Sequence, residues 1–270
     1  MTTPYAGKTA LIIGGTHGIG LETARLLLTR GAKVLLTGRR AEPVTTAAHE
    51  LSAAGFPSSS FTAIQSDITS LPAIRDLIPR VESSFGAGTS IDLLFVNAGY
   101  AVFEPTTAVT EEIFDRTFNT NTRGAFFVTQ TLLPYIRPGG AIVFTTSVSI
   151  HGGFPGLSVY SASKAAVHSF AQTLAAELAR YPDGKEGPGI RVNVVSPGYV
   201  DTPTMGTSRV TEEEIVEHKK YGAASTPMGR IAQPEEVARA VAFLGFEATF
   251  TSGEEVLVDG GSRLLKTMPA

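Results

Sequence analysis

The stretch KTALIIGGTHGIG, residues 8–20, decides the fold of this chain. Its first half is a short apolar run, Lys8–Ile13, with the length of a buried strand. A glycine-rich turn follows, and a helical pattern of apolar residues then runs from Leu21 until Gly31 closes it. Strand, turn and helix in this order predict a βα unit whose first helical N–H groups can hold a phosphate.

We expect glycines in this turn because larger residues would not fit there. A side chain at Gly14 or Gly20 would obstruct the turn or the close contact of strand and helix. The spacing is Gly-x-x-x-Gly-x-Gly, which differs from the commoner Gly-x-Gly-x-x-Gly. A tight turn that needs glycine for packing alone is the alternative, but the flanking strand and helix favour nucleotide binding.

The end of the second predicted strand, Val34–Thr37, indicates which nucleotide is bound. An NAD-binding fold places an acidic residue about 20 residues after the glycine turn, where it holds the ribose 2′-hydroxyl. No Asp or Glu occurs between residues 33 and 41, whereas Arg39 and Arg40 do, and His17 lies in the turn itself. Because a guanidinium suits a 2′-phosphate, we expect NADP (NADPH), with NAD second. Two solvated arginines at a strand end are the alternative.

Five further apolar runs alternate with helical patterns along the chain. This alternation predicts βαβ units and a parallel sheet with right-handed crossovers. The expected fold class is α/β, a single-domain Rossmann fold over residues 1–270 whose doubly wound, seven-stranded parallel sheet carries helices on both faces. The further predicted strands are Phe61–Gln65, Ile91–Val96, Ala141–Thr145, Ile190–Val195 and Glu254–Val258. The further predicted helices are Glu42–Ala54, Glu111–Ile136 and one that carries Tyr160 and ends at Pro182-Asp183-Gly184.

Composition excludes several classes of function. The chain has 270 residues, of which 43% are hydrophobic and 17% charged, enough for a large core. The formal net charge is −3 without a basic block, so we expect neither nucleic acid nor a membrane surface as partner. There is no cysteine, and the five histidines form no metal-ligand spacing, so no metal is expected. Without a signal segment or a long apolar run, we expect a cytoplasmic protein.

The pair of residues that points to chemistry is Tyr160 and Lys164, which share one face of a predicted helix. A free tyrosine has a pKa near about 10 and is a poor base at neutral pH. A nearby ammonium favours the phenolate, so we expect Lys164 to lower the pKa of Tyr160. The pair could then take or give a proton. Such a pair also occurs by chance on exposed helices, so it needs support from the rest of the chain.

Other polar residues stand where predicted strands end. Asn97-Ala98-Gly99 follows one strand with small side chains that would let a cofactor approach. Ser147 follows the next strand, and a glycine-rich loop could bring its hydroxyl beside Tyr160. Asp67 could cap a helix or bind an adenine, and both readings stay open. Asn121 falls inside a predicted helix, where a packing role is the commoner one.

The segment Asp201–Gly229 is the least regular part of the chain. It combines prolines and glycines with a short charged helix, Thr211–Tyr221. Long segments of this kind often close over substrates, so we expect a substrate lid, with a surface excursion as the alternative. The expected pocket walls suit an apolar or aromatic ketone, although each aromatic could equally pack in the core. The predicted substrate contacts are Ser147, His151, Phe154, Tyr160 and Tyr199, with Leu157 and Phe103 as further wall residues.

Taken in order, these motifs resemble the short-chain dehydrogenase/reductase family along nearly the whole chain. The specificity lies in the ordered set, and each motif alone is weak. The set consists of Gly14…Gly18-Ile19-Gly20, Asp67, Asn97-Ala98-Gly99, Asn121, Ser147, Tyr160-x-x-x-Lys164 and Pro197-Gly198. Two residues depart from the family pattern. Ile13 stands where the family has Thr, and Val96 where it has a second Asn. Each departure loses a side chain that would tie loops together, and we expect only local effects.

The resemblance implies a role for each site residue. Asn121, Ser147, Tyr160 and Lys164 match the family's catalytic tetrad, in which Ser147 would stabilise the carbonyl oxygen and Asn121 would hold a water that links Lys164 to solvent. The implied cofactor contacts are Gly14, Thr16, His17, Gly18, Ile19, Gly20, Arg39, Arg40, Asp67, Ile68, Asn97, Ala98, Gly99, Tyr160, Lys164, Pro197, Gly198, Val200 and Thr202. The family also implies a homo-oligomer, either a tetramer or a dimer.

The reaction expected from this set is the NADP(H)-dependent interconversion of a ketone and a secondary alcohol, with Tyr160 as general acid/base. A 3-oxoacyl thioester is an alternative substrate, since reductases of that class share the motifs used here. Epimerisation or dehydration on the same scaffold is a second alternative, because a fold does not fix a function. A nucleotide sensor without catalysis is the third, which the complete tetrad disfavours.

Overall fold

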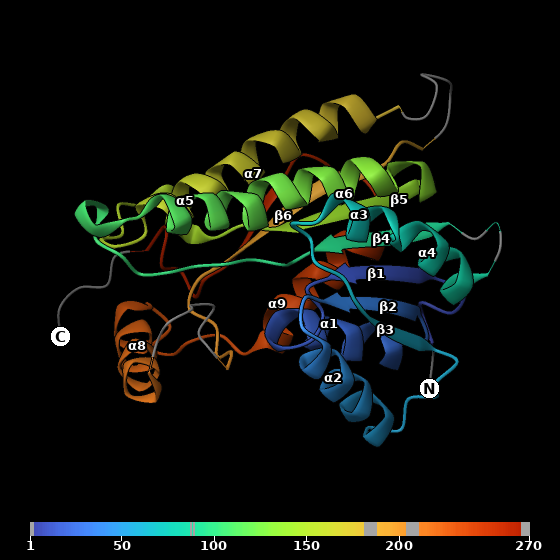
Figure 1. Ribbon diagram of the computed structural model, residues 1–270, viewed down its shortest axis with the longest axis horizontal. Coiled ribbons are helices and arrows are strands. Elements are labelled where there is room, and N and C mark those ends of the chain that lie inside the picture. Colours follow the sequence, from blue (N-terminus) through green and yellow to red (C-terminus); the bar gives the residue numbers. More distant parts are fainter. Residues whose placement is uncertain (1–2, 87, 89, 181–187, 204–210, 266–270) are drawn as a thin grey trace.

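Seven strands form the centre of the computed structural model, which describes residues 3–86, 88, 90–180, 188–203 and 211–265 (Figure 1). They are β1 (Thr9–Ile13), β2 (Lys33–Gly38), β3 (Phe61–Gln65), β4 (Ile91–Val96), β5 (Ile136–Thr145), β6 (Arg191–Pro197) and β7 (Glu255–Val258). Neighbouring strands run parallel in the order β3-β2-β1-β4-β5-β6-β7. The predicted fold class is therefore confirmed.

The chain builds this sheet outward from β1 in two directions. β2 and β3 extend it to one edge, and β4 then returns to the other side of β1 and starts the second half. Between the carboxyl ends of β1 and β4 the strand order reverses, and ligands of open α/β sheets bind at such switch points. The glycine turn, residues 14–20, follows β1, and residues 97–99 follow β4, so both lie at this crevice.

Helices cover both faces of the sheet (Figure 1). One face carries α1 (Gly18–Thr29), α2 (Ala41–Ala53) and α9 (Pro234–Ala242). The other carries α3 (Leu71–Arg75), α4 (Leu77–Phe85), α6 (Gly124–Leu132) and α7 (Ser158–Leu178). The remaining helical segments are η1 (Thr106–Ala108), α5 (Glu111–Phe118), η2 (Asn119–Arg123), η3 (Leu133–Tyr135), η4 (Val148–His151), α8 (Glu212–Ser225) and η5 (Phe243–Glu247). Within the described ranges, none of the helices has the length and apolar character needed to cross a membrane.

The central strands are buried along their whole length because both faces are covered. Leu11 of β1 and Leu94 of β4 pack against the α6–α7 side, whereas Ile12 and Phe95 pack against the α1–α9 side. Each of these four side chains is 0% exposed. Burying a side chain of this size contributes about 1.5–3 kcal/mol, so the core holds the strand ends that form the site in fixed places.

The long helix predicted over Glu111–Ile136 is wrong in two details. Its middle turn, η2, is a π-helix that contains Asn121, and η3 ends the helical run so that β5 already begins at Ile136. π-turns inside α-helices occur frequently at functional sites. Apolar spacing cannot show such a turn, because the turn changes the hydrogen-bond partner and leaves the side-chain types unchanged.

Other predicted boundaries lie close to the observed ones. α7 ends at Leu178, and the predicted stop at residues 182–184 lies outside the described residues. α8 begins after Thr211, whose hydroxyl accepts a hydrogen bond from Glu214 N while the Glu214 carboxylate accepts one from Thr211 N. This capping box fixes the start of the short charged helix that the sequence predicts. Residues 204–210 of the predicted lid also lie outside the described part.

Candidate active site

The glycine turn has the close contacts that were predicted from its sequence. A Cβ on Gly14 would lie 2.7 Å from the backbone of Ala98, and a Cβ on Gly20 would lie 2.1 Å from the carbonyl oxygen of Gly14. Gly14 also has a φ of +83°, a left-handed conformation that residues with a side chain rarely adopt. The turn therefore leaves its backbone open at the start of α1, where N–H groups favour an anion.

Asn97 connects this turn to the end of a second strand. Its Nδ2 donates to the Gly14 carbonyl oxygen at 2.8 Å, and its Oδ1 accepts from Thr145 Oγ1 at 2.9 Å. One amide therefore ties the ends of β1, β4 and β5 together. The turn also has a bond to β2, because Gly14 N donates to the backbone oxygen of Thr37 at 3.2 Å. These contacts hold the loops although Ile13 and Val96 are apolar.

Two exposed cations directly follow the end of β2. Arg39 and Arg40 are both exposed, and Gln65 Nε2 fixes the backbone between them and β3 by donating to Arg39 O at 3.0 Å. The pKa of His17 lies below its ordinary value, first because of burial and second because of the positive charge of Arg40. His17 is therefore an uncharged neighbour of Arg40, and the arginines supply the positive charge here.

Asp67 does not cap the helix that follows it. The N-cap of α3 is Ser70, whose hydroxyl accepts from Ala73 N. The Asp67 carboxylate accepts instead from Thr69 N at 2.9 Å and from Thr69 Oγ1 at 2.8 Å. Of the two readings of Asp67, the helix cap is thus wrong, because the local turn with Thr69 offers the carboxylate two donors. Adenine binding stays a prediction.

Ser147 and Tyr160 meet through their hydroxyl groups, as the loop between them allows. Ser147 caps η4, and its Oγ accepts from Ser149 N at 3.2 Å. Tyr160 lies on the first turns of α7, close enough to Ser147 for the serine hydroxyl to lower the pKa of the phenol. The phenol lies deep among protein atoms while part of the tyrosine surface stays accessible. A carbonyl oxygen placed between the two hydroxyls could therefore receive hydrogen bonds from both.

Lys164 is the buried cation of the site. Its Nζ donates to the backbone oxygen of Thr145 at 2.8 Å, and the residue is 3% exposed. Burial lowers the pKa of Lys164 from 10.5 to about 8, because a charge is costly away from water. The amine lies 6.0 Å from the centre of the Tyr160 ring, on the same helix face. A buried lysine whose pKa is close to neutral can take part in proton transfer.

The prediction that Lys164 lowers the pKa of Tyr160 is wrong for this structure. Burial raises the pKa of Tyr160 above its ordinary value, and the hydrogen bond with Ser147 opposes this only in part. The amine is directed toward Thr145 and is itself easily deprotonated, so burial of the phenol dominates. Tyr160 is consequently protonated at neutral pH, the state in which it can give a proton.

Asn121 is fully engaged, and it connects the helices to the loop after β4. Its Oδ1 accepts from Tyr100 N at 2.7 Å, and its Nδ2 donates to Tyr100 O and to Ser163 Oγ, both at 2.9 Å. A Cβ on Gly99 would lie 3.5 Å from Lys164 Nζ and 3.7 Å from Asn121 Oδ1. Asn121 and Lys164 therefore converge beside Gly99, and the water-holding role of Asn121 stays a prediction.

Described residues after β6 lie against the glycine turn. A Cβ on Gly18 would lie 2.9 Å from the side chain of Thr202, so the predicted cofactor contacts of the two segments are neighbours. Further along, the rings of Phe103 and His218 lie 4.9 Å apart and join the loop after β4 to α8. These two contacts, one before α8 and one within it, suit a lid over the site, and the lid stays a prediction.

The predicted substrate contacts have different surroundings. Phe154 is 37% exposed, as a pocket wall would be before substrate binds. Tyr199 packs against Tyr221 of α8, with ring centres 6.1 Å apart, and lines a cavity of about 360 Å³ that also reaches Leu257. His151 Nε2, by contrast, lies 2.8 Å from the carboxylate of Glu255. Its ring is thus held by a protein group, and substrate contact by His151 stays a prediction.

Sequence reasoning missed three residues that support the site. Thr145 binds Asn97 with its hydroxyl and Lys164 with its carbonyl group, and Ser163 binds Asn121. Glu255 holds His151. Ser163 could have been found from the sequence, because it lies between Tyr160 and Lys164. Nothing in the sequence marks Thr145 or Glu255, because their partners come from distant parts of the chain.

Comparison with known proteins gives matches over nearly the whole chain. A family profile described as enoyl-(acyl carrier protein) reductase matches residues 14–263. Hydroxynaphthalene reductase-like protein Arp2 of Metarhizium brunneum is 36% identical over 95% of this chain and 95% of its own length. Hydroxynaphthalene reductase arp2 of Aspergillus fumigatus is 32% identical over 93% of this chain and 90% of its own length.

Solved structures agree with these matches. A protein described as a short chain dehydrogenase/reductase family protein is 36% identical, with a TM-score of 0.81 over 97% of this chain and 100% of its own. A short chain dehydrogenase from Burkholderia cenocepacia, solved in complex with NADP, is 31% identical, with a TM-score of 0.82 over 96% of this chain and 99% of its own.

Proposed function

Because the chain belongs to the short-chain dehydrogenase/reductase family of oxidoreductases, we propose that it interconverts a ketone and a secondary alcohol with NADP(H). The observation that carries this proposal is the meeting of Ser147, Tyr160 and Lys164 at the carboxyl edge of the sheet. Two neighbouring hydroxyls, each with one proton, offer a carbonyl oxygen two donors, and the buried amine lies on the same helix face. Gly99, just after β4, lies beside this amine, since a Cβ on it would be 3.5 Å from Lys164 Nζ.

Each of the three side chains has its own task in ketone reduction. Tyr160 donates its proton to the carbonyl oxygen, and its raised pKa keeps that proton in place at neutral pH. Ser147 hydrogen-bonds the same oxygen and stabilises the negative charge that develops there. Lys164, whose pKa is about 8, returns a proton toward Tyr160 after the transfer, along the face of α7 that both residues share.

The residues of the crevice fit NADP(H). The glycine turn leaves space that a Cβ on Gly14 or Gly20 would fill, so a pyrophosphate can approach the backbone at the start of α1. The exposed Arg39 and Arg40 suit a 2′-phosphate, and a relative was solved in complex with NADP. When bound, NADPH supplies the hydride for the carbonyl carbon. Ala98 and Gly99 leave the nicotinamide side of the crevice free of bulky groups.

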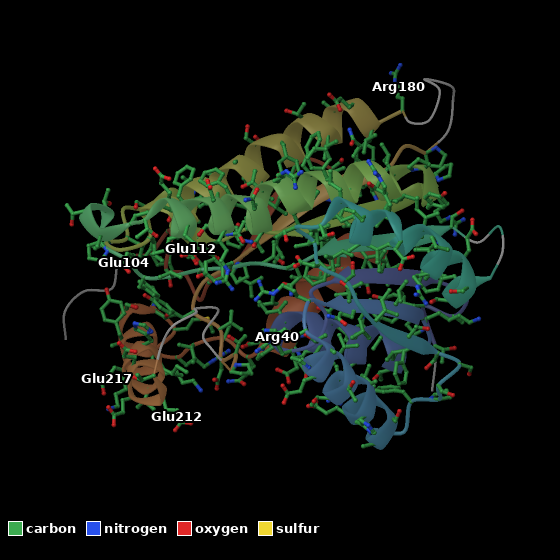
Figure 2. The ribbon with its side chains drawn as sticks, viewed as in Figure 1. Arg40, Glu104, Glu112, Arg180, Glu212 and Glu217 are labelled. Carbon is green, nitrogen blue, oxygen red and sulfur yellow. The ribbon has the colours of Figure 1, made fainter. Side chains whose placement is uncertain are left out.

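The substrate that we propose is a free aromatic ketone. Curated relatives over 90% or more of their length are named hydroxynaphthalene reductase or hydroxynaphthalene reductase-like protein, and a hydroxynaphthalene is the tautomer of a bicyclic ketone. The aromatic groups Phe103, Phe154 and Tyr199 support the same class. Glu212 and Glu217 project from α8 into solvent (Figure 2), so this surface disfavours a carrier protein that docks through acidic residues.

The test of this function is NADPH oxidation by the purified protein across a panel of ketones. The panel contains bicyclic aromatic ketones, aliphatic ketones and 3-oxoacyl thioesters, each with NADPH and with NADH. We expect turnover of bicyclic aromatic ketones that prefers NADPH and falls about 10²–10⁴-fold in Tyr160→Phe. Near-normal turnover in Tyr160→Phe would exclude the role of the phenol. Turnover of thioesters alone would replace the proposed substrate class.

We also propose a homo-oligomer, supported by exposed aromatic side chains on one helical run. Phe114 of α5 is 47% exposed and Phe126 of α6 is 42% exposed. Exposed apolar groups on neighbouring helices suit a contact with a second copy of the chain. Light scattering on the wild type and on Phe114→Gln/Phe126→Gln tests this: a mass that drops to 28.4 kDa only in the variant supports the contact. An unchanged mass would exclude it.

A further inference from the structure

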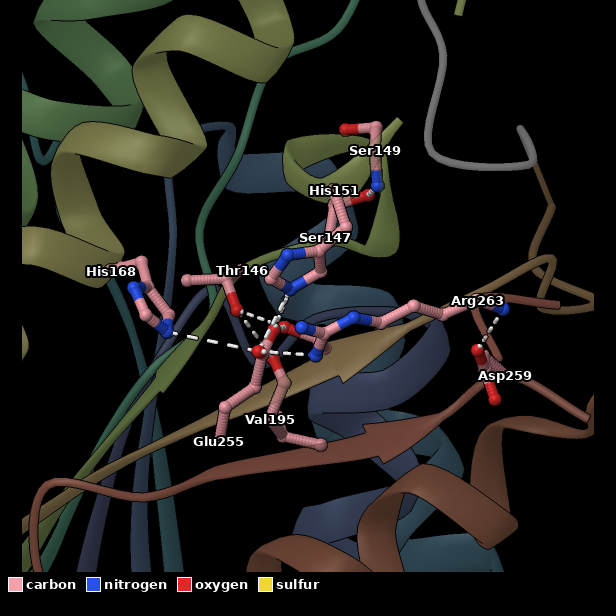
Figure 3. Close-up of polar contacts among 10 residues, drawn as sticks. Thr146, Ser147, Ser149, His151, His168, Val195, Glu255, Asp259 and Arg263 are labelled. Carbon is pink, nitrogen blue, oxygen red and sulfur yellow. Dashed lines mark hydrogen bonds and ion pairs between the residues drawn. The ribbon is translucent and has the colours of Figure 1, made fainter. Parts of the chain in front are cut away.

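We propose that Glu255 is a positioning residue for Ser147, because its carboxylate holds both ends of the segment that carries this serine (Figure 3). The segment, residues 146–151, leaves the end of β5 and contains η4. Glu255 lies on β7, at the edge of the sheet and two strands away from β5. The catalytic consequence rests on the function proposed above, whereas the positioning of the segment does not.

The far end of the segment is held by a direct contact. His151 is the last residue of η4, and its Nε2 lies 2.8 Å from both carboxylate oxygens of Glu255. A proton on Nε2 is thus shared between two acceptors. The His151 side chain is 20% exposed and that of Glu255 is 9% exposed, so the carboxylate side of this contact is shielded from water.

The near end of the segment is held through one intermediate. Ser196 of β6 donates its hydroxyl proton to the Glu255 carboxylate. The same Ser196 hydroxyl forms a hydrogen bond of 2.5 Å with Thr146 Oγ1. Thr146 directly precedes Ser147 and is also fixed by its backbone, since Thr146 N donates to Val195 O at 2.9 Å. One carboxylate therefore reaches the residue before Ser147 and the residue four positions after it.

A guanidinium and a second imidazole complete the surroundings of this carboxylate. Arg263 Nη1 lies 3.1 Å from Glu255 Oε2, and His168 Nε2 of α7 lies 3.7 Å from the same oxygen. His168 lies one turn beyond Lys164 on the same helix, so the carboxylate also contacts the helix that carries Tyr160. Burial alone would raise the pKa of Glu255, but the hydrogen bonds of Ser196 and His151 and the nearby histidines lower it overall. The group is thus a stable anion.

A carboxylate at this position of β7 is unexpected from the strand pattern. Val256 and Val258 point to the core on the α1–α9 side, so Glu255 and Leu257 face the α7 side of the sheet. An apolar residue at position 255 would pack there at no electrostatic cost. The structure instead desolvates a charge and surrounds it with donors, an arrangement that fixes the geometry of those donors.

The consequence of this geometry is a defined place for the serine hydroxyl. Ser147 must direct its hydroxyl proton to the same substrate oxygen as Tyr160, and a misplacement of about 1 Å can cost on the order of 100-fold in rate. η4 is a single short turn that lies between two held residues, Thr146 and His151. Its anchors at Thr146 and His151 therefore decide where Ser147 Oγ lies.

The first test measures the segment itself and needs no substrate. Amide hydrogen exchange is compared in wild type, Glu255→Val, Glu255→Gln and the neighbouring exposed control Glu254→Gln. We expect exchange in the peptide 146–151 to become about 10-fold faster in Glu255→Val, with a smaller change in Glu255→Gln, which keeps one acceptor oxygen. The control and peptides of α1 should be unchanged. Equal exchange in all four proteins, or an increase spread over the whole chain, would overturn the proposal.

The second test asks whether Glu255 acts through Ser147. In the reductase assay, Glu255→Val should lower kcat about 10-fold, while the Kd for NADPH, from fluorescence titration, stays within about twofold of wild type. In a Ser147→Ala background the same substitution should cost less than about twofold, because the group to be positioned is gone. A full 10-fold loss in that background would show a general structural role and overturn the proposal. Absence of ketone turnover in the wild type would instead refute the proposed function, and the exchange result alone would then decide on the positioning of the segment.

Discussion

Replacing Lys164 by methionine should make the protein more stable at pH 7 while it abolishes activity. Methionine has a similar length and no charge, so it fills the buried site without the cost of desolvating an ammonium. The pKa of Lys164 falls from 10.5 to about 8 on folding, and the residue is 3% exposed. A basic group whose pKa is lower in the folded state destabilises that state at every pH at which the group is still protonated.

The size of the expected gain in stability follows from the lowered pKa of Lys164. A difference of about 2.5 pKa units corresponds to about 3 kcal/mol below pH 8, from which the lost hydrogen bond to Thr145 O removes about 1 kcal/mol. We therefore expect Lys164→Met to gain about 2 kcal/mol in the free energy of unfolding at pH 7. Between pH 8 and 10.5 the unfolded wild type binds more protons than the folded one, so wild-type stability rises with pH and the gain disappears.

Urea unfolding followed by circular dichroism, at pH 7 and at pH 9.5, measures both values. Lys33→Met, at an exposed position of β2, is the matched control and should show no pH-dependent gain. A Lys164→Met variant that is less stable than wild type at pH 7, or a gain that is equal at both pH values, would refute the assignment of a costly buried ammonium.

Three further predictions address the cofactor and the chemistry. Arg39→Ala should reduce the ratio of kcat/KM with NADPH to that with NADH by about 10- to 100-fold, since a charge-assisted hydrogen bond to the 2′-phosphate is lost; an unchanged ratio would show that Arg39 does not contact it. Gly20→Ala should lower the free energy of unfolding by about 1–3 kcal/mol and abolish NADPH binding, because its Cβ would lie 2.1 Å from Gly14 O. The control Gly153→Ala, which has open space around it, should change neither the stability nor NADPH binding. The kcat/KM of ketone reduction should fall as the pH rises through about 8, where Lys164 of the free enzyme loses its proton. A profile that stays flat to pH 10 would contradict this.

The sheet and the main site residues could be predicted because their signals are local. Apolar runs with helical patterns between them predict all seven strands, and only the start of β5 is displaced by as many as five residues. The glycine turn marks the end of the sheet at which a cofactor is expected. The pair Tyr160 and Lys164 and the strand-end Ser147 meet in the structure, because parallel strands place their carboxyl ends at one edge.

The parts that could not be predicted depend on contacts between distant residues or on burial. The π-turn at Asn121 changes hydrogen bonds and leaves the apolar pattern intact. The contact of His151 with Glu255 joins residues 104 positions apart. The pKa of Tyr160 was predicted with the wrong sign, because spacing shows a neighbouring lysine but does not show how deeply the phenol is buried or that Lys164 is directed toward Thr145.

Deuterium transfer from NADPH is the measurement that tests the central claim most directly. The protein is incubated with a bicyclic aromatic ketone and NADPH that carries deuterium at either face of C4 of the nicotinamide, and the product is analysed by mass spectrometry and NMR. We expect deuterium from one of the two labelled forms on the carbinol carbon in the wild type, and none above background in Tyr160→Phe over the same time. Absence of deuterium from the product with both labelled forms, despite NADPH binding, would contradict hydride transfer to a ketone at this site.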